Sequence, residues 1–140
     1  MRSVLRFGNV EDYPVPPRSA ADTDEYLLYV HIPFCETLCP YCSFHRYAFT
    51  GELARPYFDA LLTELSMYKK LGYDFKGMYV GGGTPTISLD GLTRVLDYCR
   101  ENFSIRELSV ETNPNHLTDR HLKVLKDAGV NRLSVGVQSF

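Results

Sequence analysis

Apolar, strand-like runs alternate with amphipathic helical runs along most of this chain, and that alternation restricts the fold it can adopt. The strand-like runs are Tyr26 to Ile32, Lys76 to Val80, Glu107 to Glu111 and Arg132 to Gln138. The helical runs between them are Arg55 to Lys70, Leu89 to Arg100 and Asp119 to Ala128. Because strands that alternate with helices pair in parallel through crossover connections, the sequence predicts an α/β fold with about four parallel strands and three helices.

Local signals support each predicted helix. Pro56 lies near the start of the first helix, where its missing N–H costs least. Ser88 is a good N-cap for the second helix. Thr118 can cap the first turn of the third helix, and Gly129 supplies the residue that follows its last turn.

Four strands of this kind are too few to close a barrel. We therefore expect residues 26–140 to form the N-terminal portion of a partial (β/α) barrel, with later units lost or with another chain covering the exposed edge. Residues 1–25 contain three prolines and an acidic stretch and show little periodicity. They are predicted to be a loosely wrapped lead segment.

The last two predicted strands have one apolar face and one polar face. In residues 107–111, Leu108 and Val110 form the apolar face, which should contact the helices. Strands buried on both faces are usually continuous in Val, Ile and Leu, so the polar face indicates the wall of a cavity. Glu111 and Gln138 stand at the carboxyl ends of their strands, where barrels of this kind place active-site groups.

Three of the four cysteines follow the first predicted strand at the spacing C-x3-C-x2-C, namely Cys35, Cys39 and Cys42. A disulfide between two of them would close a small, strained ring, so ligation of a metal or cluster is the better interpretation. Three thiolates could hold a [4Fe-4S] cluster and leave one iron without a protein ligand. The alternative is a zinc module in which His45 completes a Cys3His site. Cys99 shares a helical stripe with Leu and Val and is predicted to be a buried hydrophobic residue.

Charge and composition exclude several function classes. Fifteen basic and seventeen acidic side chains give a net charge of −2, without a basic stripe, so neither nucleic acid nor a membrane surface is expected as a partner. The start lacks the pattern of a signal peptide, and no apolar stretch approaches the roughly 18 residues that span a bilayer. We expect a soluble, cytoplasmic protein. A Rossmann domain is disfavoured because Gly81-Gly-Gly lacks the G-x-G-x-x-G spacing.

Five motifs together resemble one known family. They are Tyr29-Val-His-Ile-Pro-Phe-Cys35, Cys39-Pro-Tyr-Cys42, Gly81-Gly-Gly-Thr-Pro85, Glu111-Thr-Asn-Pro114 and Gly136-Val-Gln-Ser-Phe140. In this order they are similar to the radical S-adenosylmethionine (SAM) enzymes of the oxygen-independent coproporphyrinogen III oxidase group and to their haem-chaperone relatives. The resemblance implies two cofactors, a [4Fe-4S] cluster and SAM, and reductive cleavage of SAM to a 5′-deoxyadenosyl radical that abstracts hydrogen from a substrate.

The same resemblance implies a place in porphyrin or haem metabolism. The partners it implies are a tetrapyrrole or other small-molecule substrate and an electron donor such as flavodoxin or ferredoxin. It assigns Cys35, Cys39 and Cys42 as the cluster ligands. It also implies that Tyr41, between two ligands, packs near the cluster and the adenine of SAM.

Further roles are carried over for the SAM site. Gly82, Gly83 and Thr84 match the turn that approaches the SAM amino group, where missing Cβ atoms let the backbone reach the ligand. Glu111 and Gln138 match the polar pair that bonds the ribose and the methionyl part of SAM.

The first predicted strand supplies the candidates for catalytic residues. Tyr29 matches a residue near the cluster and the substrate carboxylate, and His31 shares its strand face. The alternative is that both are core residues with satisfied polar atoms. The remaining histidines, His45, His116 and His121, are interpreted as ordinary polar positions.

One departure from the family pattern bears on the activity. The oxidase pattern has a fourth cysteine two residues beyond the third ligand, and this chain has Phe44 there. The departure argues against coproporphyrinogen decarboxylation, and the Pro-Tyr-Cys stretch looks more like the chaperone branch. Three hypotheses stay open: a radical SAM oxidoreductase, a haem chaperone-like protein that binds the cluster and SAM, and a non-catalytic fragment.

Overall fold

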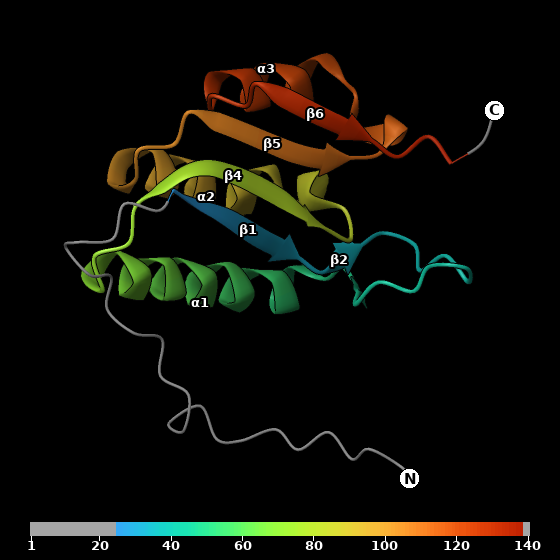
Figure 1. The fold of residues 1–140 in the computed structure, drawn as a ribbon. Helices are drawn as coiled ribbons and strands as arrows, with labels where there is room; N and C mark the ends of the chain where they lie inside the picture. Colours follow the sequence, from blue (N-terminus) through green and yellow to red (C-terminus); the bar gives the residue numbers. More distant parts are fainter. Residues whose placement is uncertain (1–24, 139–140) are drawn as a thin grey trace, which may run out of the picture.

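The computed structural model describes residues 25–138 as a parallel sheet with helices on one side (Figure 1). The sheet contains β1 (Tyr26–Ile32), β4 (Phe75–Gly82), β5 (Glu107–Thr112) and β6 (Arg132–Val135), in that order. The connecting helices are α1 (Gly51–Lys70), α2 (Leu89–Asn102) and α3 (Asp119–Asp127). The predicted α/β fold with four parallel strands and three helices is confirmed. The predicted lead segment, apart from Glu25, lies outside the described residues.

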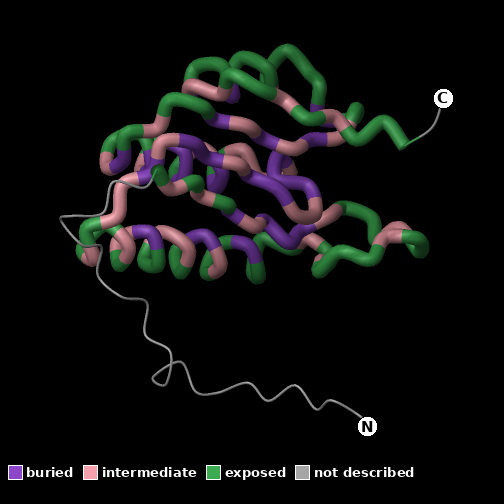
Figure 2. Tube along the Cα trace, in the orientation of Figure 1, coloured by how far each residue is buried: buried purple, intermediate pink, exposed green. Residues whose placement is uncertain are grey.

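The hydrophobic core lies between the helices and one face of the sheet (Figure 2). Leu108 and Val110 of β5 are buried in this core, as their alternation predicts. On the opposite face of the sheet, Leu27 and Tyr29 of β1 are largely exposed. Because the helices cover only one face, the polar side chains of β5 and β6 are left free to line a cavity.

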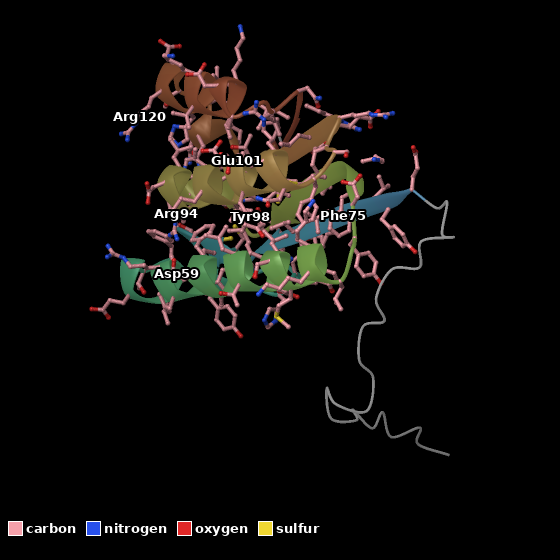
Figure 3. The ribbon with its side chains drawn as sticks, turned by 90° about the vertical axis from the view of Figure 1, so that its left-hand side faces the viewer. Asp59, Phe75, Arg94, Tyr98, Glu101 and Arg120 are labelled. Atoms are coloured by element: carbon pink, nitrogen blue, oxygen red, sulfur yellow. The ribbon has the colours of Figure 1, made fainter. Side chains whose placement is uncertain are left out.

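Close packing joins the first two helices. Gly91 of α2 lies against the ring of Phe58 of α1, and a Cβ atom on Gly91 would come within 2.4 Å of that ring. At the surface, Arg94 of α2 pairs with Asp59 of α1 at 2.7 Å (Figure 3). Since both charges are exposed, the pair contributes at most about 1 kcal/mol, and the buried Phe58 contact dominates the packing.

The helix caps mostly agree with prediction. Ser88 accepts a hydrogen bond from the N–H of Gly91, and Thr118 accepts one from the N–H of His121. Gly129 follows α3 with a φ of +84°, a conformation that glycine adopts without steric cost.

Two predicted boundaries differ most from the structure. Helix α1 begins at Gly51 rather than Arg55, because the hydroxyl of Thr50 caps the N–H of Leu53. Strand β6 ends at Val135 rather than Gln138. Gln138 adopts a φ of 68°, in the left-handed region, which a β-strand does not contain.

None of the helices between residues 25 and 138 combines the length and the apolar character needed to cross a lipid bilayer.

Candidate cofactor-binding site

The carboxyl ends of the four parallel strands point toward one edge of the sheet, and the cysteine-containing loop leaves β1 at this edge (Figure 1). Two short strands, β2 (Phe34–Cys35) and β3 (Tyr47–Ala48), pair in parallel and close the loop at its base. The N–H of Tyr47 donates to the carbonyl of Pro33 at 2.6 Å, and that of Phe49 to Cys35 at 2.9 Å. The loop therefore begins and ends on a fixed backbone ladder.

Arg46 fixes the middle of the cysteine loop. Its guanidinium donates hydrogen bonds to the backbone carbonyls of Cys39 and Cys42. The pKa of the Cys42 thiol is lowered, chiefly by a hydrogen bond from the backbone N–H of Phe44 and further by Arg46. All three loop cysteines are partly exposed free thiols, whereas Cys99 is buried in α2 as predicted.

The glycine turn after β4 lies directly against the first cysteine. The N–H of Gly83 donates to the carbonyl of Ile32, and the N–H of Thr84 donates to that of Phe34, both at 2.8 Å. A Cβ atom on Gly83 would lie 2.6 Å from the Phe34 carbonyl oxygen and 2.8 Å from Sγ of Cys35. Only glycine permits this close approach.

Glu111 connects the end of β5 to the same turn. Its carboxylate accepts hydrogen bonds from the Tyr79 hydroxyl at 2.6 Å and from the backbone N–H of Gly82 at 3.1 Å. The hydrogen bond to the Glu111 carboxylate raises the pKa of Tyr79, because it favours the protonated phenol. A carboxylate has about four acceptor sites, so Glu111 can still accept hydrogen bonds from a ligand.

These elements surround a cavity of about 550 Å³, within the range of roughly 300–1,000 Å³ typical of small-molecule sites. The sequence-predicted residues that line it are Cys35, Cys39, Tyr41, Cys42, Gly82, Gly83, Thr84, Glu111 and Gln138. Further lining comes from Glu36, Phe44, Arg46, Thr112, Asn113 and Ser134, among others. The cavity therefore brings together the cysteine loop and the residues at the carboxyl ends of β4, β5 and β6.

Tyr29 and His31 share one strand face but are not part of the cavity lining. The Tyr29 hydroxyl lies 3.0 Å from Nδ1 of His31, and Nε2 of His31 lies 3.0 Å from the carbonyl of His45. The Tyr29 ring stacks on Tyr79 with centroids 6.1 Å apart. Tyr79 therefore contacts both Tyr29, by ring stacking, and Glu111, by its hydroxyl hydrogen bond.

Sequence reasoning missed the burial of His116, which was interpreted as an ordinary polar position. His116 is only 7% exposed and lies at the end of a 3₁₀ turn, Pro114–His116, that follows β5. Asn113 caps this turn by accepting a hydrogen bond from the N–H of His116. The Asn-Pro dipeptide indicates such a turn, but a local pattern does not reveal the burial of the ring.

The cysteine loop brings the donor type of an iron–sulfur cluster to the cavity. Cys35, Cys39 and Cys42 all line it, and thiolates are the ligands that such clusters take. Among residues 25–138, no group of three His, Cys, Asp or Glu side chains is arranged to hold a single metal ion, and the ring of His45 packs against Tyr47. The donor set present is therefore compatible with a [4Fe-4S] cluster held by three cysteines.

Comparisons with known proteins agree with this site. The Radical SAM superfamily profile matches residues 29–140. The chain is 42% identical over 119 residues to the heme chaperone HemW of Bacillus subtilis, covering 80% of this chain and 31% of that protein. It is 37% identical over 121 residues to the oxygen-independent coproporphyrinogen III oxidase of Paracoccus denitrificans, covering 81% of this chain and 27% of that protein.

A solved structure shares the fold. Coproporphyrinogen III oxidase (HemN) from Escherichia coli, described as a radical SAM enzyme, matches with a TM-score of 0.76 and 36% identity. The match covers 86% of this chain and 30% of that one. The chain thus spans about a third of the length of the relatives it matches.

Proposed function

Because the chain belongs to the radical SAM superfamily, we propose that Cys35, Cys39 and Cys42 hold a [4Fe-4S] cluster and that SAM binds beside it in the cavity. One observation carries the proposal: the glycine turn lies against the first cysteine, with the Thr84 hydroxyl 3.7 Å from Sγ of Cys35. Cofactors bound between the glycine turn and the cysteine loop would contact the thiolate of Cys35 and the backbone groups of the turn together.

To bind the cluster, the protein would hold three thiolates on one loop. The β2–β3 ladder fixes the base of the loop, and Arg46 fixes two of the three cysteine carbonyls. Arg46 also favours thiolate formation at Cys42, and thiolates are the species that ligate iron.

On the SAM side, Gly82, Gly83 and Thr84 offer backbone groups to the methionyl amino group. The free acceptor sites of Glu111 and the amide of Gln138 would bond the ribose and methionyl groups. Tyr41 is 71% exposed on the loop, where it can pack over the adenine.

When bound, the cofactors would supply the chemistry, namely one-electron reductive cleavage of SAM to methionine and a 5′-deoxyadenosyl radical that would abstract hydrogen from the substrate. The side chains orient the cofactors. Tyr29 and His31 are proposed to act toward the substrate, since their hydrogen bond holds both on the open sheet face.

We further propose a role in porphyrin or haem metabolism, in the cytoplasm. The names of the relatives support it, because they include heme chaperones, an anaerobilin synthase and oxygen-independent coproporphyrinogen III oxidases. A tetrapyrrole or another small molecule would be the substrate, and a flavodoxin or ferredoxin would supply the electron.

A haem chaperone-like role is the second candidate, and Phe44 favours it. Phe44 occupies the position of the oxidase pattern's fourth cysteine, lines the cavity and is 70% exposed. A phenyl ring cannot supply a thiolate there. The Phe44 position therefore argues for cofactor binding without oxidase activity.

Reconstitution of the chain under anaerobic conditions with iron and sulfide tests both candidates. After reduction with dithionite in the presence of SAM, the enzyme proposal predicts equal amounts of methionine and 5′-deoxyadenosine, and Cys39→Ser should abolish both. SAM binding without cleavage would favour the chaperone-like candidate. Absence of SAM binding despite an intact cluster would contradict both.

A further inference from the structure

A buried histidine connects the end of β5 to the cysteine loop. Nδ1 of His116 lies 2.7 Å from the hydroxyl of Thr86, and its Nε2 lies 3.5 Å from a carboxylate oxygen of Glu36. Glu36 follows Cys35 directly and lines the cavity. We propose that His116 is a positioning residue, which holds the first turn of the cysteine loop through Glu36. The inference rests on the proposed role of Cys35 as a cluster ligand.

Contacts on both sides of the ring connect His116 to neighbouring segments. Nε2 faces the Glu36 carboxylate, a group that only accepts hydrogen bonds. Nδ1 is hydrogen-bonded to the Thr86 hydroxyl, and the direction of this bond depends on the tautomer of the ring. The Thr86 hydroxyl lies 2.8 Å from that of Thr112, which donates to the carbonyl of Asn113 at 3.4 Å. These contacts connect the end of β5 to the start of the cysteine loop.

The surroundings of His116 keep its ring in one orientation. Thr86 and Thr112 are 0% and 6% exposed, so their hydroxyls have little access to water as an alternative partner. The ring of His121 stacks on that of His116, with centroids 5.0 Å apart and planes at 11°. A ring held by these contacts keeps its Nε2 atom at a constant position beside Glu36.

This contact complements the anchor that Arg46 provides. Arg46 binds the carbonyls of Cys39 and Cys42, in the later part of the loop. His116 acts on Glu36, at the start of the loop, where Glu36 is otherwise 61% exposed. The two anchors restrain the start and the middle of the loop, which would reduce the ordering needed when the cluster assembles.

Hydrogen–deuterium exchange tests whether His116 restrains the cysteine loop. In the apo chain, we expect amides of residues 36–46 to exchange about 2- to 10-fold faster in His116→Phe and in Thr86→Val, as loss of one hydrogen bond would produce. The control is Asp59→Asn, which removes the exposed pair with Arg94 and does not touch Glu36. Equal exchange in the native chain and in both variants would overturn the proposal. Thr86→Val, which preserves side-chain shape, keeps the test valid if His116→Phe does not fold.

Iron loading separates this inference from the proposed function. If the native chain assembles a cluster, His116→Phe and Thr86→Val should assemble it about 2- to 10-fold more slowly, and Asp59→Asn should assemble it at the native rate. If the native chain takes up no iron, the proposed function fails. If iron loading is equal in all four chains, the positioning role alone fails.

Discussion

The carboxylate of Glu111, at the end of β5, accepts a hydrogen bond from the backbone N–H of Gly82, 3.1 Å away in the turn that follows β4. This bond joins two of the segments that form the cavity. It also orients the carboxylate, because the Tyr79 hydroxyl holds the other oxygen at 2.6 Å. A ligand at this site would thus meet an acceptor group that is already fixed in place.

Glu111→Gln should weaken SAM binding by roughly 10- to 100-fold, since hydrogen bonds to charged groups contribute about 1.5–3 kcal/mol. Anaerobic equilibrium dialysis of the reconstituted chain with labelled SAM measures the effect. Glu107→Gln is the matched control, because Glu107 lies on the same face of β5 at the far end of the strand. If both variants bind SAM as the native chain does, Glu111 has no role in the site.

Gly83→Ala should impair cluster assembly, because its Cβ atom would lie 2.8 Å from Sγ of Cys35 and 2.6 Å from the Phe34 carbonyl oxygen. Overpacking of this kind costs about 1–3 kcal/mol in the free energy of unfolding, which urea denaturation measures. Gly51→Ala at the start of α1 is the control, since its Cβ atom meets nothing within 4 Å. That variant should be neutral or more stable by up to about 1 kcal/mol. Equal stability and iron loading of both variants would contradict the close approach at Gly83.

The four thiols of the apo chain should react in two classes. Burial raises the pKa of Cys99 to about 12, so its reactive thiolate is scarce at pH 8. Cys35, Cys39 and Cys42 are partly exposed. Alkylation followed by mass spectrometry should therefore label the three loop cysteines quickly and Cys99 only after denaturation. Rapid labelling of Cys99 in the native state would show that its side chain is accessible to solvent, which contradicts its burial in α2.

Asp74 should make the stability depend on acid pH. Burial raises its pKa, but hydrogen bonds from Lys76 and from the backbone N–H of Ser104 outweigh this effect and lower the pKa to about 2, from an ordinary 3.8. A depressed pKa stabilises the fold above about pH 4, and this contribution is lost as the pH falls toward 2.

Asp74→Asn should lower the free energy of unfolding by about 1–2 kcal/mol at pH 7 and by little at pH 2. Denaturation curves at both pH values measure the difference. Asp59→Asn, which removes the exposed pair with Arg94, should cost at most about 1 kcal/mol. A loss for Asp74→Asn that is equal at both pH values would show that the carboxylate charge is not responsible.

Much of the fold follows from local patterns in the sequence. Strand β1 has the predicted bounds, Tyr26–Ile32, because one apolar run determines it. Leu108 and Val110 are buried as their alternation predicts. The placement of Cys35 and Glu111 on one cavity also follows, since parallel strands bring their carboxyl ends to one edge of the sheet.

Features that depend on long-range contacts could not be predicted. Strands β2 and β3 contain only two residues each, and their pairing depends on backbone hydrogen bonds across the loop rather than on side-chain periodicity. The burial of His116 depends on Thr86 and Glu36, which are distant in sequence. Strand β6 ends at Val135 although the apolar alternation continues to Val137, and the left-handed backbone of Gln138 is not visible in that pattern.

The iron and acid-labile sulfide content of the anaerobically reconstituted chain tests the central claim most directly. The account predicts about four iron and four sulfide per chain, and their loss when serine replaces Cys35, Cys39 or Cys42. Cys99→Ser should load as the native chain does, because Cys99 is buried in α2. Zinc without sulfide, or full iron loading after serine replacement in the loop, would contradict the claim.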